Sequence, residues 1–247
     1  MTKLSVNMNV PALLRNRRDQ PWPDVADLGR QALAAGAFGL TVHPRPDERH
    51  TRPSDVYALG ALIAEAFAGR ELNVEGYPDA RFLEIVNAAA PHQVTLVPDA
   101  PDQATSDHGW DFVKDRALLA EWIEKLRAPG RRIAVFADAE AEQMAAAAEI
   151  GVDRVELYTG PYGAAHSSSD ARERELSRLA DAAQAARAAG LGVNAGHDLT
   201  VLGTQQLVQR IPEIDEVSIG HALFCDTLTY GLRETVKRYL AACAAKS

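Results

Sequence analysis

Short runs of apolar residues alternate with longer amphipathic stretches along the whole chain. The short runs are typical of strands buried in a sheet. The longer stretches repeat apolar residues at helical spacing, as Leu118, Trp122 and Leu126 do. The pattern predicts strands at residues 4–9, 38–42, 72–74, 93–97, 133–136, 154–158, 191–195 and 216–219. It predicts helices at residues 24–36, 55–67 (with Ser54 as the N-cap), 79–89, 114–126, 140–150, 171–189, 200–210 and 227–242.

The predicted elements alternate strictly, eight strands with eight helices. The joints at residues 35–39, 149–152 and 189–192 form a weak internal repeat of helix end, glycine and strand. Repeated units of this kind build parallel sheets. Eight of them in 247 residues predict an α/β fold, a single (β/α)8 TIM barrel with a parallel eight-stranded core, forming one domain over residues 1–247.

Composition and charge limit the partners of the chain. Its formal net charge is -8, which makes non-specific attraction to nucleic acid or to an anionic membrane unfavourable. We find neither a membrane-spanning apolar stretch nor a signal peptide. The two cysteines, Cys225 and Cys243, have no metal-type spacing and indicate a reducing compartment, so we expect a cytoplasmic protein.

Polar and titratable residues follow the predicted strands directly, and a barrel gathers all of these strand ends around one opening. For Asp99 and Asp138 we expect no more than contact with water. His43, Glu75 and His197 are different, because imidazole and carboxylate groups facing one pocket can exchange protons near neutral pH. The predicted mouth contains Asn7, Asn9, His43, Arg45, Glu75, Asp99, Asp138, Glu156, Thr159, His197, Asp198, Gly220 and His221.

Glu156 lies between Val155 and Leu157, so strand alternation points it into the barrel. A buried carboxylate is costly without a partner, and it is explained by a structural ion pair or by a catalytic role, of which we favour the second. Glycines after the last two strands, before His197-Asp198 and His221, predict a phosphate site.

Arg18, Arg45 and His50 are the side-chain candidates for a second anion. No spacing of histidines and carboxylates predicts a metal site. Two polar segments, residues 100–111 and 161–170, are predicted loops and candidate lids.

A set of motifs runs in order from the first strand to the last. It comprises Asn7 with Leu14-Arg15-Asn16 and Arg18, Thr41-Val42-His43-Pro44-Arg45 with Arg49-His50, Asn73-Val74-Glu75, Leu96-Val97-Pro98, Glu156 with Thr159-Gly160, Val193-Asn194-Ala195-Gly196-His197, and Ile219-Gly220-His221-Ala222. Together these motifs resemble the pyridoxine 5′-phosphate synthase family.

The resemblance implies a cofactor-free and metal-free barrel enzyme, a transferase and homo-octamer whose active sites borrow from neighbouring copies. It would condense 3-amino-2-oxopropyl phosphate with 1-deoxy-D-xylulose 5-phosphate to pyridoxine 5′-phosphate, phosphate and water. The implied roles are proton acceptor for His43 and Glu75, proton donor for His197, and transition-state stabiliser for Glu156. Asn7, Arg18, Asp198, Gly220 and His221 would hold the amino ketone phosphate, and Arg45, His50 and Thr105 the deoxyxylulose phosphate.

The chain departs from the family pattern at two places. Asn9-Val10 stands where many members have Asp-His, which removes a charge and an imidazole from the sugar-phosphate side. Asp198 stands where glycine is common, so its backbone N–H rather than its carboxylate would meet a phosphate. Two other functions stay open: another sugar-phosphate aldolase or isomerase on the same barrel, or a non-catalytic paralogue that binds a phosphorylated metabolite. An aldolase that forms a Schiff base lacks support, because no predicted strand carries a lysine.

Overall fold

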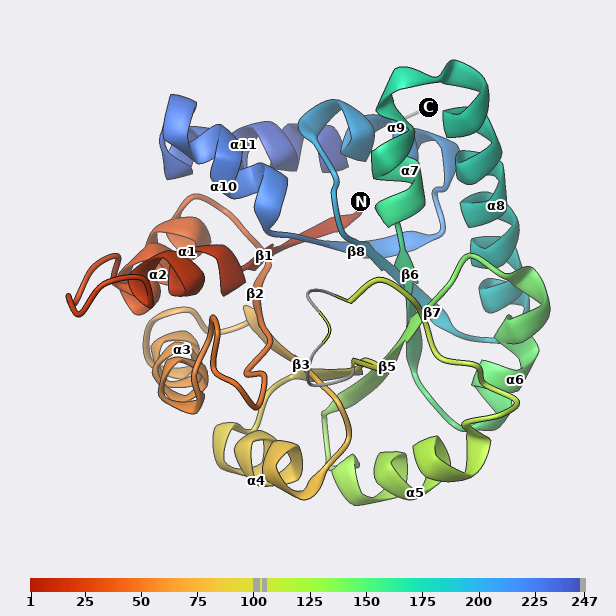
Figure 1. Ribbon diagram of the computed structural model, residues 1–247, viewed down its shortest axis with the longest axis horizontal. Coiled ribbons are helices and arrows are strands. Elements are labelled where there is room, and N and C mark those ends of the chain that lie inside the picture. Colours follow the sequence, from red (N-terminus) through yellow and green to blue (C-terminus); the bar gives the residue numbers. More distant parts are fainter. Residues whose placement is uncertain (100–102, 104–105, 245–247) are drawn as a thin grey trace.

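Eight parallel strands close into a barrel in the computed structural model, which describes residues 1–99, 103 and 106–244 (Figure 1). Each strand pairs with the next along the chain, and the last pairs with the first. This confirms the predicted fold. The strands are β1 (Lys3–Asn7), β2 (Gly39–Val42), β3 (Glu71–Gly76), β4 (Gln93–Leu96), β5 (Arg132–Ala137), β6 (Arg154–Tyr158), β7 (Gly192–Gly196) and β8 (Ile214–Ile219).

A ring of helices surrounds the barrel and buries its apolar outer face (Figure 1). The ring consists of α2 (Val25–Ala34), α3 (Pro53–Ala66), α4 (Ala80–Ala89), α5 (Arg116–Leu126), α6 (Met144–Glu149) with the preceding 3-10 turn η1 (Ala141–Gln143), α8 (Ser169–Ala188), α9 (Val201–Arg210) and α11 (Leu232–Cys243). None of the helices that the structure describes is both long and apolar enough to cross a membrane.

The prediction of one helix after each strand is wrong at three strands. After β1, β6 and β8 an extra helix precedes the ring helix: α1 (Asn9–Arg15), α7 (Gly160–Ala164) with the 3-10 turn η2 (Ala165–Ser167), and α10 (His221–Tyr230). The first two are too short to show a helical period, and α7 with η2 occupies most of the predicted loop at 161–170. The predicted helix at 227–242 is divided by Gly231, whose φ of +75° ends α10 and starts α11.

The start of α3 also differs from its prediction. The helix begins at Pro53 rather than Asp55, and Ser54 is not its cap. Proline suits the first helical position, because the N–H that it lacks has no helical partner there. The Asp55 carboxylate instead accepts a hydrogen bond from the backbone N–H of Arg52, at 2.8 Å, which closes the first turn.

The barrel interior is polar, whereas bulky branched side chains usually fill it in this fold. Hydrogen bonds cross it, such as the 3.0 Å bond from Thr95 Oγ1 to Asn73 Oδ1 and the 3.4 Å bond from Asn194 Nδ2 on β7 to Gln93 Oε1 on β4. Strand alternation therefore presents apolar residues to the helices and polar residues to the centre. The centre of the barrel can thus hold acid–base groups such as Glu156.

Candidate active site

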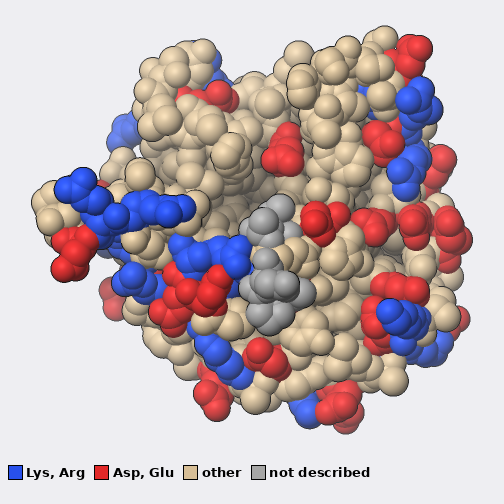
Figure 2. All heavy atoms as spheres, in the orientation of Figure 1, with Lys and Arg blue, Asp and Glu red and all other residues tan. Residues whose placement is uncertain are grey.

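A cavity of about 390 Å³ opens at the carboxyl ends of the strands. Figure 2 shows this end of the molecule, with a hollow above the centre and Lys and Arg side chains gathered on the side of α1 and α2. The cavity is lined by nine of the predicted site residues: Asn7, His43, Arg45, His50, Glu75, His197, Asp198, Gly220 and His221. Residues that lie far apart in the sequence thus meet where the barrel geometry predicts.

His43 and Glu75 face each other from the ends of neighbouring strands, and both are buried. His43 Nδ1 lies 4.0 Å from Glu75 Oε2. Burial, together with the nearby His50 and Arg45, lowers the pKa of His43 well below its ordinary value. Burial and the carboxylates of Glu156 and Asp99 raise the pKa of Glu75 well above its ordinary value. Both shifts favour the uncharged forms, so the pair can exchange a proton without leaving an isolated buried charge.

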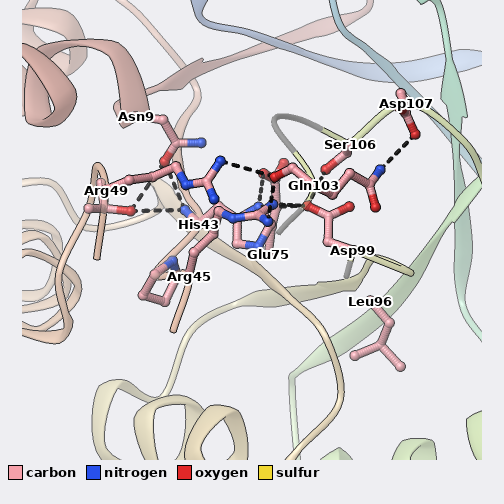
Figure 3. Close-up of polar contacts among 12 residues, drawn as sticks. Asn9, His43, Arg45, Arg49, Glu75, Leu96, Asp99, Gln103, Ser106 and Asp107 are labelled. Atoms are coloured by element: carbon pink, nitrogen blue, oxygen red, sulfur yellow. Dashed lines mark hydrogen bonds and ion pairs between the residues drawn. The ribbon is translucent and has the colours of Figure 1, made fainter. Parts of the chain in front are cut away.

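Asp99 contradicts the prediction that it merely meets water. It is buried and forms an ion pair with Arg45, and it also accepts a 2.8 Å hydrogen bond from Ser106 Oγ (Figure 3). Its Oδ2 lies 4.0 Å from His43 Nδ1. The sequence around Asp99 could not distinguish an exposed aspartate from one buried against an arginine, because its partner Arg45 lies in a loop 54 residues away.

Arg45 and Arg49 hold the segment that follows β4. Arg45 Nη2 donates to the carbonyl oxygen of Gln103 at 2.8 Å, and Arg49 Nη1 donates to the same oxygen at 3.0 Å. Figure 3 shows both guanidinium groups reaching this segment from the β2–α3 loop. The arginine predicted to bind a phosphate therefore also anchors a wall of the cavity.

Replacing Asp99 with alanine is expected to lower the free energy of unfolding by about 3 kcal/mol, because it leaves the Arg45 guanidinium buried without its carboxylate. Urea unfolding measures this loss. The matched control is Asp107→Ala, whose side chain is 59% exposed and whose effect should stay within about 0.5 kcal/mol. Equal effects of the two variants would contradict a structural ion pair at Asp99.

His197 lies in an unusual turn after β7. Its φ is +86° and that of Asp198 is +53°, a left-handed conformation that non-glycine residues rarely adopt. The hydroxyl of the buried Thr159 donates to the carbonyl oxygens of Gly196, at 2.6 Å, and of His197. These bonds hold the turn in which Asp198, although not a glycine, has a positive φ.

Two aromatic rings enclose the His197 imidazole. The ring of Phe136 lies 4.9 Å from it, and the ring of Tyr158 lies 5.5 Å from it in an edge-on arrangement. Burial lowers the pKa of His197. Sequence reasoning missed Tyr158, which also lines the cavity. Strand alternation contained the signal, because Tyr158 is two residues beyond Glu156 on the same inward face of β6.

Glu156 lies inside the barrel, and 1% of its surface is exposed. A Cβ on Gly196 would come within 2.6 Å of Glu156 Oε1, so a larger residue at position 196 would displace the carboxyl group. Burial and the carboxylate of Glu216 raise the pKa of Glu156 to about 8. Its Oε2 has no hydrogen-bond partner among the residues that the structure describes. These observations indicate a carboxyl group kept protonated near neutral pH.

The raised pKa of Glu156 makes stability depend on pH. Because the folded protein holds this proton more tightly than the unfolded chain, the stabilising contribution is complete below about pH 4.5 and is lost as the pH rises to about 8. Relative to wild type, Glu156→Gln should therefore gain on the order of 4 kcal/mol of unfolding free energy between pH 5 and 8.5. Denaturant unfolding at both pH values measures this gain. Glu124→Gln, at an exposed position on α5, should keep the wild-type dependence.

The start of α10 borders the cavity. The helix begins at His221, directly after Gly220, and N–H groups at a helix start have no helical partners and favour anions. Gly220 packs closely on Asn7, since a Cβ on residue 220 would lie 3.2 Å from the Asn7 Cβ. The predicted phosphate site after β8 thus coincides with the N-terminus of a helix that the sequence did not reveal.

One predicted binding residue is not part of this cavity. Arg18 is exposed in the segment between α1 and α2 and does not line it. Thr105 lies outside the residues that the structure describes. In the described part of the chain, no group of three or more His, Cys, Asp or Glu side chains is arranged to hold a metal ion.

Comparison with known proteins gives close relatives over nearly the whole chain. The family model described as pyridoxal phosphate biosynthesis protein PdxJ matches residues 4–245. A pyridoxine 5′-phosphate synthase of Mesorhizobium japonicum is 58% identical over 241 residues, which is 98% of each chain. Another, from Brucella anthropi, is 59% identical over 242 residues, covering 98% of this chain and 99% of the relative.

Solved structures share the fold at low identity. Phosphoribosyl anthranilate isomerase of Thermotoga maritima superposes with a TM-score of 0.63 at 10% identity, over 98% of both chains. A mutant tryptophan synthase α-subunit of Pyrococcus furiosus gives a TM-score of 0.63 at 15% identity, over 98% of this chain and all of that one. These similarities establish the barrel alone.

Proposed function

The chain belongs to the PdxJ family of pyridoxine 5′-phosphate synthases, and we propose that the acid–base groups of its cavity carry the condensation. The reaction joins 3-amino-2-oxopropyl phosphate and 1-deoxy-D-xylulose 5-phosphate to give pyridoxine 5′-phosphate, phosphate and water. Imine formation, loss of water, loss of phosphate and ring closure each require a proton transfer. The observation that carries the proposal is the meeting of His43, Glu75 and His197 around one cavity.

His43 and Glu75 serve as the proton acceptors. His43 is neutral near pH 7, because burial lowers its pKa, and a neutral imidazole accepts a proton readily. The raised pKa of Glu75 makes its carboxylate, once formed, a stronger base than an exposed glutamate. The 4.0 Å between His43 Nδ1 and Glu75 Oε2 places the two acceptors beside the same part of the cavity.

His197 serves as the proton donor. Burial lowers its pKa, so the side chain must take up a proton before it can donate one. A phosphate dianion bound beside it favours the imidazolium. The start of α10 and the turn at Asp198, which border the same cavity, are where the amino ketone phosphate would supply this charge. Substrate binding thus favours the protonated form of His197, which is the form that can donate a proton.

Glu156 stabilises charge in the transition state. At neutral pH its raised pKa keeps most of the side chain protonated, so it acts as a neutral hydrogen-bond donor toward a developing negative charge. Its buried Oε2, which lacks a partner among the described residues, is available for this bond.

The two phosphates bind on different walls. Asn7, Asp198 and the Gly220–His221 helix start hold the amino ketone phosphate, and the positive φ of Asp198 lets its backbone N–H take part. Arg45 and His50 hold the deoxyxylulose phosphate together with Thr105, which lies outside the described residues.

Arg18 acts in a neighbouring copy. It is exposed and outside the cavity of its own chain, which agrees with the expectation that active sites borrow from neighbours in a homo-octamer. The extra helices α1 and α10 expose large apolar side chains, with Leu14 59% and Leu228 87% exposed, and another copy would cover them. The thiols of Cys225 and Cys243 are both unpaired, which supports a cytoplasmic location.

A cofactor-free assay tests the function. Purified, chelator-treated protein is mixed with both substrates, and pyridoxine 5′-phosphate is followed by absorbance and mass while light scattering gives the number of chains per particle. The expected result is product without added metal from a particle of eight chains. Folded protein that makes no product would overturn the proposal. A sugar-phosphate ligand screen would then separate another barrel activity from a non-catalytic binding protein.

A further inference from the structure

The backbone N–H of His43 lies just beyond the end of the β1–β2 ladder. The last paired residues are Asn7 and Thr41, and one more bond follows, from the N–H of Met8 to the carbonyl oxygen of Thr41 at 2.8 Å. The chain then turns into α1 at Asn9, so β1 offers no further carbonyl group. A buried N–H without an acceptor is costly, and two side chains supply one here.

Asn9 and Thr51 close a ring of hydrogen bonds around this N–H. The N–H of His43 donates to Asn9 Oδ1 at 2.9 Å and to Thr51 Oγ1 at 3.1 Å. The Thr51 hydroxyl, which is fully buried, donates in turn to Asn9 Oδ1 at 3.2 Å. Since a backbone N–H can only donate, the atom of Asn9 that it faces must be the oxygen.

The backbone of Asn9 is linked to Glu75, the other proposed proton acceptor. The backbone N–H of Asn9 donates to Asn7 Oδ1 at 3.0 Å. This bond turns the Asn7 amide so that its NH₂ group faces Glu75, with which it forms a hydrogen bond that acts against the rise in the pKa of Glu75. Asn9 is thereby connected to His43 through its side chain and to Glu75 through its backbone.

We propose that Asn9 is a positioning residue, which with Thr51 sets the place of His43 relative to Glu75 and does not itself bind substrate. The inference rests on the proposed function of His43 and Glu75 as proton acceptors. This role explains why asparagine suits position 9, where the chain departs from the family pattern. The backbone N–H of His43 requires an oxygen acceptor, and asparagine supplies one without adding a negative charge beside the two acidic groups, Glu75 and Asp99.

Asn9→Ala and Asn9→Asp test the proposal in opposite directions. Alanine removes Oδ1, and a displaced general base loses rate, so kcat should fall about tenfold while KM for both substrates changes less than twofold. Aspartate keeps an acceptor oxygen and should recover most of kcat. Asn87→Ala, at an exposed position near the end of α4, is the matched control and should behave as wild type.

The pH profile of the Asn9→Asp variant gives a second readout. His43 is faced by Glu75 and Asp99, by the cations Arg45 and Arg49, and by His50 and His197. An added carboxylate beside its backbone favours the imidazolium, so the acid limb of kcat should move to higher pH. A residue that only stabilises the fold would leave this limb in place.

A direct role of Asn9 in substrate binding predicts the reverse. If its Nδ2 contacted the sugar phosphate, Asn9→Ala would raise KM for deoxyxylulose phosphate, and Asn9→Asp would raise it further by placing a carboxylate near a phosphate. That outcome would overturn the proposal. Should Asn9→Ala fail to fold, Thr51→Val with Thr51→Ser as its rescue tests the same ring, with an expected fall in kcat of about threefold for valine alone.

Amide hydrogen exchange tests the positioning role of Asn9 independently of the proposed enzymatic function. The His43 amide should exchange about tenfold faster in Asn9→Ala and at the wild-type rate in Asn9→Asp, whether or not the enzyme turns over its substrates. Wild-type protein without synthase activity would refute the proposed function but would not affect the proposed ring of hydrogen bonds around the His43 amide. Unchanged exchange in Asn9→Ala would refute the ring.

Discussion

Replacing Glu75 with glutamine is expected to lower kcat by a factor of about 10² to 10⁴, the range that a positioned general base contributes. Glutamine has nearly the same shape and can still accept the hydrogen bond from Asn7, but it cannot take a proton. Folding should be preserved, because burial raises the pKa of Glu75 and so disfavours its charged form, and glutamine carries no charge. Steady-state rates of product formation and thermal unfolding of the same sample measure the two effects.

A matched control separates loss of the base from a general disturbance. Glu65→Gln makes the same chemical change at an exposed position on α3 and should leave kcat and the unfolding temperature unchanged. Near-normal turnover of Glu75→Gln would show that the proton acceptor is elsewhere. His43, 4.0 Å away, would then be the group to replace next.

Replacing His197 with asparagine is expected to lower kcat by a similar factor, about 10² to 10⁴, by removing the proton donor. Asparagine is the informative choice, because residue 197 has a φ of +86° and asparagine tolerates the left-handed region better than most residues. The turn held by Thr159 should therefore persist. An alanine variant would mix the loss of the imidazole with a loss of backbone stability.

The KM values for the two substrates complete the test of His197. If His197 only donates a proton, KM for both substrates should change little and kcat should carry the loss. His166→Asn, at an exposed position in η2, is the control and should have wild-type kinetics. A His197→Asn variant that keeps kcat but loses affinity would make His197 a binding residue instead.

The barrel and the place of its site could be predicted from the sequence because both follow from repetition. Each strand carries its own signature, and a closed parallel barrel brings the ends of all strands to one opening, so His43, Glu75 and His197 had to meet there. The inward direction of Glu156 needed only the two-residue period of its strand.

The three extra helices could not be predicted in the same way. The helices α1 and α7 are too short to contain a full apolar stripe, and α10 merges in the sequence with α11 until Gly231 is seen to adopt its left-handed φ. Their stability comes from packing on neighbouring helices, as α10 packs on α11, α7 on α8 and α1 on α10, which is a tertiary property.

By itself the sequence determined the order of the eight strands and of the eight helices that surround them, the opening at which the acid–base groups gather, and the family, because these depend on periods and motifs read along the chain. Only the tertiary structure decided which groups touch: Asp99 with Arg45, and Asn9 and Thr51 with the N–H of His43. Asp99 and Asn9 reach their partners from other strand–helix units, Thr51 reaches His43 from eight residues along the same loop, and hydrogen bonds are sensitive to changes of a few tenths of an ångström. No pattern along one segment contains the position of another loop.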